Sequence, residues 1–179
     1  GRGADIWDQA TQIRAAVREL GLERPVILGH SFGAAIALAY GMLYPDEIAG
    51  IVSLAPVCFP ELRLEHLLFG PRALPLGGDL LTRILHASSD PALLPLLWNA
   101  MFLPQAMPQQ FRQNFPFELA GRAAQITAEG EDAGWLWPAL TRSVLGYPSL
   151  HRPVRILGGS ADLVVNTTLH GMRAAGMIP

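Results

Sequence analysis

Near the start of the chain, apolar residues recur at the spacing of one helix face. The steps between them are four, three, four and three residues, the pattern of an amphipathic helix. Asp5 stands at the position of an N-cap, and Gly21 follows the last residue of the pattern. We therefore predict a helix between Asp5 and Gly21 with a buried stripe made of Ile6, Ala10, Ile13, Val17 and Leu20.

A short uninterrupted apolar run follows at residues 26–28, and residues 50–55 carry the apolar Ile51, Val52 and Leu54; each segment is typical of a buried strand in a parallel sheet. The Ala- and Leu-rich residues 32–43 between them predict a helix. A strand, a helix and a second strand within about 30 residues form a βαβ unit, so we expect a parallel sheet with a right-handed crossover. Strand character returns at residues 154–157, and a last helix is expected to start near Asn166.

Residues 58–149 differ in character from the segments around them. They contain most of the fifteen prolines and three of the four tryptophans, without the alternation of a strand. We predict an α/β core, made of residues 1–57 and 150–179, with a helical cap inserted at residues 58–149. The helical pieces expected in the cap are residues 78–87, 91–101, 117–129 and 135–144.

Composition limits the classes of function. The chain has 179 residues, half of them apolar, which suits one domain with an insertion and excludes intrinsic disorder. Its formal net charge is −2 and only 16% of its residues are charged. We therefore expect a small-molecule substrate, and neither nucleic acid nor an anionic membrane as a partner.

Cysteine usage bears on compartment and cofactors. Cys58 is the only cysteine, so the chain has no internal disulfide, and we expect Cys58 to be a small core residue. No group of Cys and His has metal-ligand spacing, so we expect neither a metal nor a cofactor. The lack of a visible secretory signal agrees with a reducing, cytoplasmic compartment.

The segment Gly29-His30-Ser31-Phe32-Gly33 places Gly-x-Ser-x-Gly between a predicted strand and a predicted helix. A serine at such a sharp turn has a strained backbone and an exposed hydroxyl, and the flanking glycines leave room for the turn. The helix N-terminus offers its dipole and the Phe32 N–H to a developing oxyanion. We predict Ser31 as a nucleophile and Phe32 as an oxyanion donor, against the alternative of a simple turn serine.

The same region has a second interpretation. Residues 26–44 form a nearly continuous apolar stretch in which Gly29 and Gly33 are spaced as in a transmembrane dimer helix. Pro25 and Pro45 flank this stretch, no cluster of basic residues marks a cytoplasmic side, and a second strand follows at once. These features favour the strand–helix interpretation.

A serine nucleophile also needs a base and a group that orients the base. Asp162 follows the strand at residues 154–157 and is the candidate acid, in the chain order Ser, acid, His. Its alternative role is that of a turn former or helix cap. We expect His30 to be a buried support of the turn. His170 follows Asp162 too soon for the base, and His66, His86 and His151 are expected in surface or cap positions.

The segments PVILGHSFG (25–33), YPDEIAGIVSLAP (44–56) and PVRILGGSADLVV (153–165) resemble the α/β-hydrolase fold family, most closely its capped esterase and epoxide-hydrolase-like branch. The resemblance implies Ser31 as nucleophile, the Phe32 N–H as oxyanion donor and Asp162 as triad acid. It also implies an internal fragment. The second oxyanion donor would precede Gly1, and the catalytic histidine, about 25–30 residues past Asp162, would follow Pro179.

The resemblance implies a serine hydrolase that transfers an acyl group from a small hydrophobic ester to water. Serine rather than aspartate at the turn argues against epoxide hydrolase and haloalkane dehalogenase chemistry, while carbon–carbon bond hydrolysis and perhydrolysis stay open. A noncatalytic fragment or binding module that lacks the triad histidine is the alternative. Seven aromatic residues of the cap are candidates to line an apolar acyl pocket above Ser31, but we expect most of them to form the core of the cap instead; they are Trp98, Phe102, Phe111, Phe115, Phe117, Trp135 and Trp137.

Overall fold

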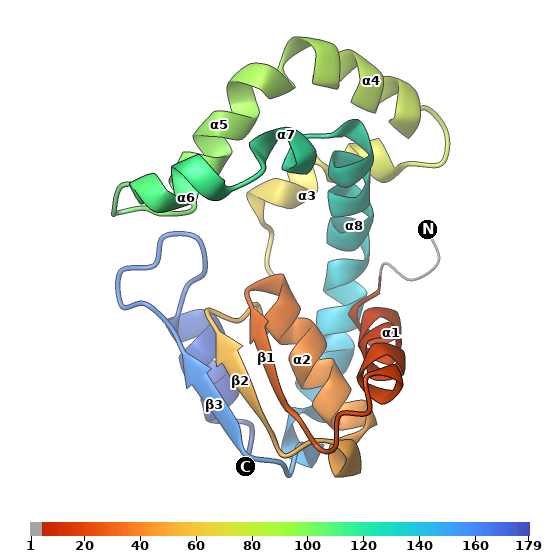
Figure 1. Cartoon of the computed structure of the whole chain (residues 1–179), viewed down its shortest axis with the longest axis vertical. Coiled ribbons are helices and arrows are strands. Elements are labelled where there is room, and N and C mark those ends of the chain that lie inside the picture. The colour runs from red at the N-terminus through yellow and green to blue at the C-terminus, as the bar shows by residue number, and fades with distance from the viewer. Residues whose placement is uncertain (1–4) are drawn as a thin grey trace. The chain divides into compact units, whose positions relative to one another are not determined.

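The three predicted strands form one parallel sheet (Figure 1). The computed structural model describes residues 5–179, apart from the side chain of Glu65. The strands lie in the order β1 (Val26–His30), β2 (Gly50–Leu54) and β3 (Val154–Leu157), as the βαβ pattern predicts. In their register His30 is opposite Leu54, and Leu54 is opposite Leu157. The carboxyl ends of all three strands therefore meet at one edge of the sheet, where the segments that follow them begin.

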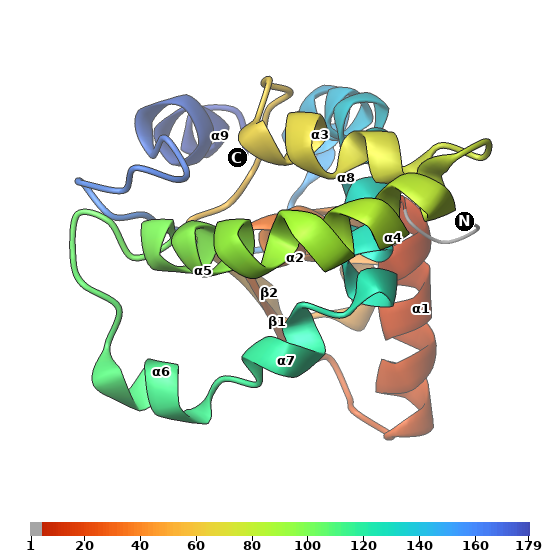
Figure 2. The same cartoon turned by 90° about the horizontal axis from the view of Figure 1, so that it is seen from above.

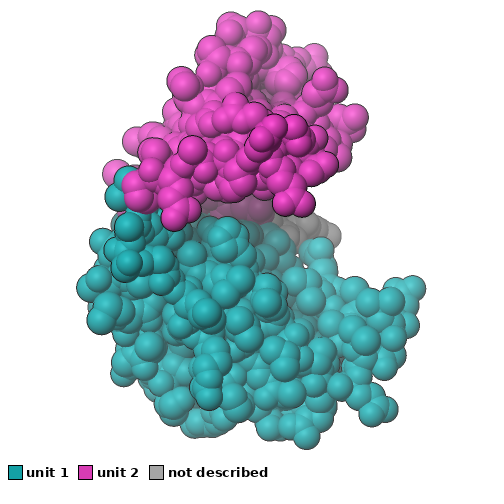
Figure 3. All heavy atoms as spheres, turned by 60° about the vertical axis from the view of Figure 1, so that its left-hand side comes forward, with its two compact units in different colours: residues 1–61, 135–179 teal, residues 62–134 magenta. Residues whose placement is uncertain are grey.

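The chain divides into two compact units, which Figure 3 shows in different colours. The first comprises Gly1–Glu61 and Trp135–Pro179, and the second comprises Leu62–Gly134. The second unit lies wholly within the predicted insertion, residues 58–149. The two ends of that insertion, residues 58–61 and 135–149, belong to the first unit because side chains such as Cys58, Leu140 and Tyr147 are buried in its core.

The helices of the first unit pack around the sheet. Helix α1 is capped as predicted, because Asp5 Oδ1 accepts a hydrogen bond of 3.0 Å from the Trp7 N–H. Helix α2 lies against β1 and β2, and its residues 34–40 are all buried. The helical elements of this unit are α1 (Ile6–Glu19), α2 (Phe32–Leu43), η1 (Pro45–Glu47), η3 (Tyr147–Ser149), the π-helical turn η4 (Thr168–Met172) and α9 (Arg173–Ala175).

Two expectations of burial are wrong. The stripe of α1 is buried at Ile6 and Ala10, but Ile13 and Leu20 are exposed. Strand β1 is not buried on both faces, since Val26 is 58% and Leu28 64% exposed. The reason is the alternation of side chains along a strand: within residues 5–179, the helices cover the face that carries Gly29, and the opposite face is open.

The structure confirms the strand–helix interpretation of residues 26–44 over the transmembrane one. The stretch divides into β1 and α2, with a sharp turn at Ser31 between them. In the described part of the chain, no helix has both the length and the apolar character needed to cross a bilayer.

The second unit is helical, as predicted, and Figure 2 shows α4 and α5 following one another along it. The piece expected at 117–129 is broken at Gly121, and the piece expected at 135–144 is part of one 24-residue helix that contains Pro138. This long helix, α8, passes from the second unit into the first. The helical elements are α3 (Leu64–Leu68), η2 (Gly70–Ala73), α4 (Gly78–Ser88), α5 (Asp90–Ala100), α6 (Gln109–Asn114), α7 (Phe117–Ala120) and α8 (Ala123–Gly146).

Candidate active site

Ser31 occupies a strained turn between β1 and α2. Its φ of 52° and ψ of −119° form a conformation that residues with a side chain rarely adopt, at a cost of about 1–3 kcal/mol. Gly29 makes the turn possible, because a Cβ at this position would lie 2.2 Å from the carbonyl oxygen of Gly33. A Cβ at Gly33 would meet nothing within 4 Å in the described residues. Of the two glycines that flank Ser31, only Gly29 is therefore needed to leave room for the turn.

Backbone hydrogen bonds hold this turn against the end of β2. The Ser31 N–H donates to the carbonyl of Leu54 at 2.9 Å, and the Ser31 carbonyl accepts from the Val57 N–H at 3.3 Å and from the Ala34 N–H at 3.1 Å. Phe32 is the first residue of α2, so its N–H has no carbonyl partner within that helix. Ser31 is thus hydrogen-bonded to Leu54 at the end of β2 and to Val57 in the segment after it, and the Phe32 N–H directly follows Ser31 in the chain.

Asp162 lies in the turn that follows β3. Its Oδ1 accepts hydrogen bonds from the N–H groups of Val164 and Val165, at 2.8 and 2.9 Å, and Oδ2 takes part in neither. The carboxylate is half-buried, and these bonds fix its orientation. The geometry suits both a turn former and an acid that orients a base. Ser31 and Asp162 follow strands that end at the same sheet edge, but no hydrogen bond joins their side chains in residues 5–179.

The prediction that His30 is a buried support of the turn is wrong. Gly29 is buried while His30 is exposed, because consecutive side chains of a strand point to opposite faces and the face of His30 is the open one. His86 and His151 are exposed, as expected, and His66 is half-buried within the second unit.

His170 is fully buried, with a relative exposure of 0%. Its Nδ1 accepts hydrogen bonds from the N–H groups of Cys58 and Phe59, and its Nε2 lies 2.9 Å from Glu61 Oε1. The ring is buried, Nδ1 accepts two backbone hydrogen bonds, and in the described residues no hydrogen bond joins the ring to Ser31, so His170 is not the base of Ser31. These contacts join residues more than 100 positions apart in the chain, and no local pattern in the sequence points to them.

Cys58 is a buried core residue, as predicted. Burial raises the pKa of its thiol to about 12, so the side chain stays protonated and is not a nucleophile at neutral pH. The Tyr147 hydroxyl donates to the Cys58 carbonyl at 2.7 Å, which further fixes this segment. Among the described residues, no three His, Cys, Asp or Glu side chains lie close enough together to hold a metal ion.

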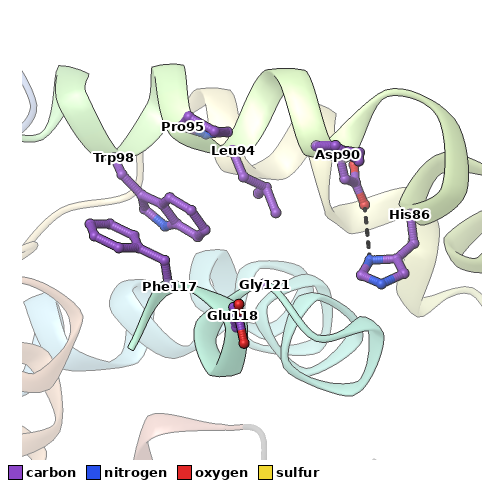
Figure 4. Close-up of a pocket in the computed structure, with 9 residues that line it drawn as sticks. His86, Asp90, Leu94, Pro95, Trp98, Phe117, Glu118 and Gly121 are labelled. Carbon is purple, nitrogen blue, oxygen red and sulfur yellow. Dashed lines mark ion pairs between the residues drawn. The ribbon is translucent and has the colours of Figure 1, made fainter. Parts of the chain in front are cut away.

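An open cavity of about 420 Å³ lies in the second unit (Figure 4). Leu94, Trp98 and Phe117 supply apolar walls, and His86 contacts Asp90 at one end. None of the predicted site residues lines it. Trp98 belongs to a cluster of half-buried rings with Phe102, Phe111, Phe115 and Phe117.

The two other tryptophans of the predicted cap differ from this cluster. Trp135 and Trp137 belong to the first unit and are exposed. They are the two of the seven aromatic residues that lie outside the cluster, because α8 continues into the first unit and carries both residues with it.

Known proteins resemble this chain in sequence and in structure. Residues 3–80 match the family model described as the alpha/beta hydrolase fold. A stretch of 42 residues is 38% identical to the 1-acylglycerol-3-phosphate O-acyltransferase ABHD5 of Sus scrofa, and covers 24% of this chain and 12% of that protein.

Solved structures resemble nearly the whole chain. A bromoperoxidase from Bacillus anthracis superposes with a TM-score of 0.69 at 16% identity, over 99% of this chain and 64% of that one. An esterase from Exiguobacterium antarcticum gives 0.68 at 19% identity, with coverages of 98% and 63%. A putative aryl esterase from Burkholderia cenocepacia gives 0.63 at 20% identity, with coverages of 97% and 59%.

The family match and the structural likenesses agree with the parallel sheet and its flanking helices. The chain has the α/β-hydrolase fold, as its sequence motifs predict. It spans less than two thirds of the length of each of these solved chains.

Proposed function

We propose that this chain carries the nucleophile of a serine hydrolase that transfers an acyl group from an ester to water. One observation carries the proposal above all others. Ser31 is held in a strained conformation at a strand-to-helix turn, next to the backbone N–H of Phe32. Strain of this kind persists only where the surrounding structure enforces it, and it is concentrated at functional sites.

The proposed reaction has two steps. Ser31 Oγ attacks the carbonyl carbon of the ester, its proton passes to a histidine, and the oxyanion accepts a hydrogen bond from the Phe32 N–H. The C–O bond to the alcohol breaks, and the alcohol leaves with that proton. Water then attacks the acyl-enzyme, which releases the carboxylic acid and restores the Ser31 hydroxyl.

Asp162 is the proposed acid of this site. Its Oδ1 is engaged by two backbone N–H groups, so the carboxylate has a fixed direction in which to orient the imidazole of the base. The chain order of such hydrolases puts the base after the acid. His170 follows Asp162 but is excluded, because its ring is buried and its Nδ1 accepts two backbone hydrogen bonds.

We propose small hydrophobic esters as substrates. The esterases among the structurally similar proteins favour an ester over other acyl donors. The helical second unit, with its apolar cavity walls and aromatic cluster, suits the role of a hydrophobic cap.

A fluorophosphonate probe tests the nucleophile directly, because it phosphonylates only an activated serine. We expect one adduct per chain, mapped to Ser31 by peptide mass spectrometry and absent from Ser31→Ala. Ser160→Ala is the matched control, since Ser160 is an exposed serine in the turn that follows β3. An adduct on another residue, or one that survives in Ser31→Ala, would contradict the proposal.

A noncatalytic binding module is the second candidate. It is favoured by one observation: within residues 5–179, no hydrogen bond connects the Ser31 hydroxyl to a histidine. A chain that unfolds cooperatively yet takes up no fluorophosphonate at Ser31 would support this candidate over the hydrolase.

A further inference from the structure

We infer that His170 is a positioning residue for the Ser31 turn. The inference rests on the proposed function, in which Ser31 is the nucleophile, and it assigns a task to a buried histidine that the proposed reaction does not use. His170 acts through the backbone of residues 57–59, which lies between its ring and Ser31.

The ring of His170 holds the segment that follows β2. Nδ1 accepts two backbone hydrogen bonds, from the Cys58 N–H at 3.0 Å and from the Phe59 N–H at 3.1 Å. Cys58 and Phe59 are both buried, so these two amides have no access to water as an alternative acceptor. A side chain without an acceptor at this position would leave both donors unsatisfied.

The same segment continues to Ser31. The Val57 N–H, one residue before Cys58, donates to the Ser31 carbonyl at 3.3 Å. Ala55, at the start of the segment, has a φ of 41°, and its N–H donates to the carbonyl of Leu157 at 2.7 Å. A continuous series of hydrogen bonds therefore runs from His170 through residues 57–59 to the backbone of the proposed nucleophile.

Glu61 favours one tautomer of His170. Because Nδ1 accepts two N–H donors, it carries no proton, and in the neutral ring the proton is on Nε2. Nε2 lies 2.9 Å from Glu61 Oε1, a contact that is electrostatic rather than a well-aligned hydrogen bond. The Glu61 carbonyl accepts from Trp137 Nε1–H at 2.8 Å, so this residue is anchored through its backbone as well. The carboxylate thus favours the tautomer that leaves Nδ1 free to accept.

Two substitutions of His170 distinguish the role of Nδ1 as a hydrogen-bond acceptor from that of the rest of the ring. His170→Leu removes the acceptor, whereas the amide oxygen of His170→Asn stands near the position of Nδ1 and restores it. Ile48→Ala is the matched control, because Ile48 is equally buried but precedes β2, at the opposite end of the strand from the Ser31 turn.

The first readout is the rate at which a fluorophosphonate labels Ser31 in protein that is shown to be folded by a cooperative melt. We expect His170→Leu to slow labelling by about tenfold to hundredfold, the range for a displaced catalytic group. His170→Asn is expected to recover most of the rate. Ile48→Ala is expected to lower the melting temperature and leave the labelling rate unchanged.

The second readout is amide hydrogen exchange at Val57, Cys58 and Phe59, with the ¹⁵N NMR tautomer pattern of His170 in the unmodified chain. We expect slow exchange that becomes fast in His170→Leu and slow again in His170→Asn, and a ring protonated on Nε2 only. The NMR pattern needs no variant, so it decides the case even where His170→Leu does not fold.

The outcomes distinguish the two proposals. Equal labelling rates in the unmodified chain and in folded His170→Leu, or a proton on Nδ1, would overturn the positioning role and leave the nucleophile intact. No labelling of the unmodified chain, with exchange at residues 57–59 that still depends on His170, would overturn the proposed function alone.

Discussion

At the scale of single residues, the Ser31 turn depends on Gly29 more than on Gly33. The strained turn of Ser31 brings the backbone of Gly33 within 2.2 Å of the place where a Gly29 Cβ would stand. Backbone atoms cannot rotate away as the end of a side chain can, so any substitution of Gly29 has to displace the turn itself.

We predict that Gly29→Ala abolishes fluorophosphonate labelling of Ser31 and lowers the free energy of unfolding by about 1–3 kcal/mol, as expected for overpacking. Gly33→Ala is the matched control in the same motif. It meets no atom within 4 Å in the described residues and is expected to keep both labelling and stability. If Gly29→Ala and Gly33→Ala kept the same labelling and the same free energy of unfolding, a side chain at Gly29 would fit into the turn, contrary to the structure.

The sequence predicts this turn because all of its signals are local. Five consecutive residues specify a strand end, a serine and two small neighbours, and the apolar runs on both sides identify the strand and the helix. The exposure of His30 was not predictable in this way, because it depends on which face of the sheet the helices cover. The burial of His170 was equally unpredictable from the sequence, since its hydrogen-bond partners lie in a segment distant in sequence.

At the scale of elements, a charged pair joins α1 to η1. Arg14 Nε donates to Glu47 Oε2 at 2.8 Å, and a second guanidinium nitrogen bonds Oε1. The hydrogen bond from Arg14 is the main cause that lowers the pKa of Glu47 below its ordinary value of 4.5. A carboxylate with a lowered pKa in the folded state stabilises the fold above its ordinary pKa, and this contribution is lost as pH falls through the lowered value.

We therefore expect the melting temperature of the chain to fall as pH drops below 4.5, and to fall less in Glu47→Gln. Glu23→Gln, at an exposed acid in the segment that follows α1, is the control and is expected to follow the unmodified chain. Thermal melts at a series of pH values check this. If the melting temperatures of the unmodified chain and of Glu47→Gln fell equally with pH, the Arg14–Glu47 pair would not contribute to stability.

In the second unit, a buried ion pair joins η2 to the start of α5. Arg72 and Asp90 are 2% and 1% exposed, and their two hydrogen bonds measure 2.6 and 2.7 Å. Removing one partner leaves the other charge buried without compensation, which is far more costly than replacing both partners by apolar side chains.

Asp90→Ala is expected to lower the free energy of unfolding by about 3–5 kcal/mol, while the double variant Arg72→Met with Asp90→Leu stays within about 1 kcal/mol of the unmodified chain. Urea denaturation gives both values. Asp79→Ala, at an exposed acid in the first turn of α4, is the control and is expected to have little effect. A double variant as unstable as Asp90→Ala would show that the charges themselves are required.

Helix ends that depend on local residue types could be predicted from the sequence, whereas those that depend on tertiary packing could not. The cap of α1 and the start of α2 follow from local residue types and were predicted. The sequence predicts separate helices at residues 117–129 and 135–144, whereas α8 runs without a break from Ala123 to Gly146. Packing of residues such as Leu136 and Leu140 in the core of the first unit favours the continuous helix instead.

At the scale of the whole molecule, the sheet presents an open apolar face. Val26, Leu28 and Leu157 are all more than half exposed on it, and in residues 5–179 β1 is an edge strand. Parallel sheets are as a rule covered on both faces, and exposed apolar patches and free strand edges promote association.

We predict that the purified chain associates in a concentration-dependent way, and that Leu28→Arg reduces this association. Leu76→Arg is the control, since Leu76 is an exposed leucine of the second unit and lies outside the sheet. Sedimentation velocity over a range of concentrations measures the effect. A chain that stays monomeric at every concentration would contradict the prediction.

The central claim is that Ser31 forms a covalent bond to the acyl group, and trapping the acyl-enzyme tests it most directly. The chain is mixed with p-nitrophenyl acetate, quenched in acid and digested, and the peptides are analysed by mass spectrometry. We predict an acetyl group on Ser31 that is absent from Ser31→Ala. Release of p-nitrophenol with the acetyl group on another residue, or at an equal rate in Ser31→Ala, would contradict it.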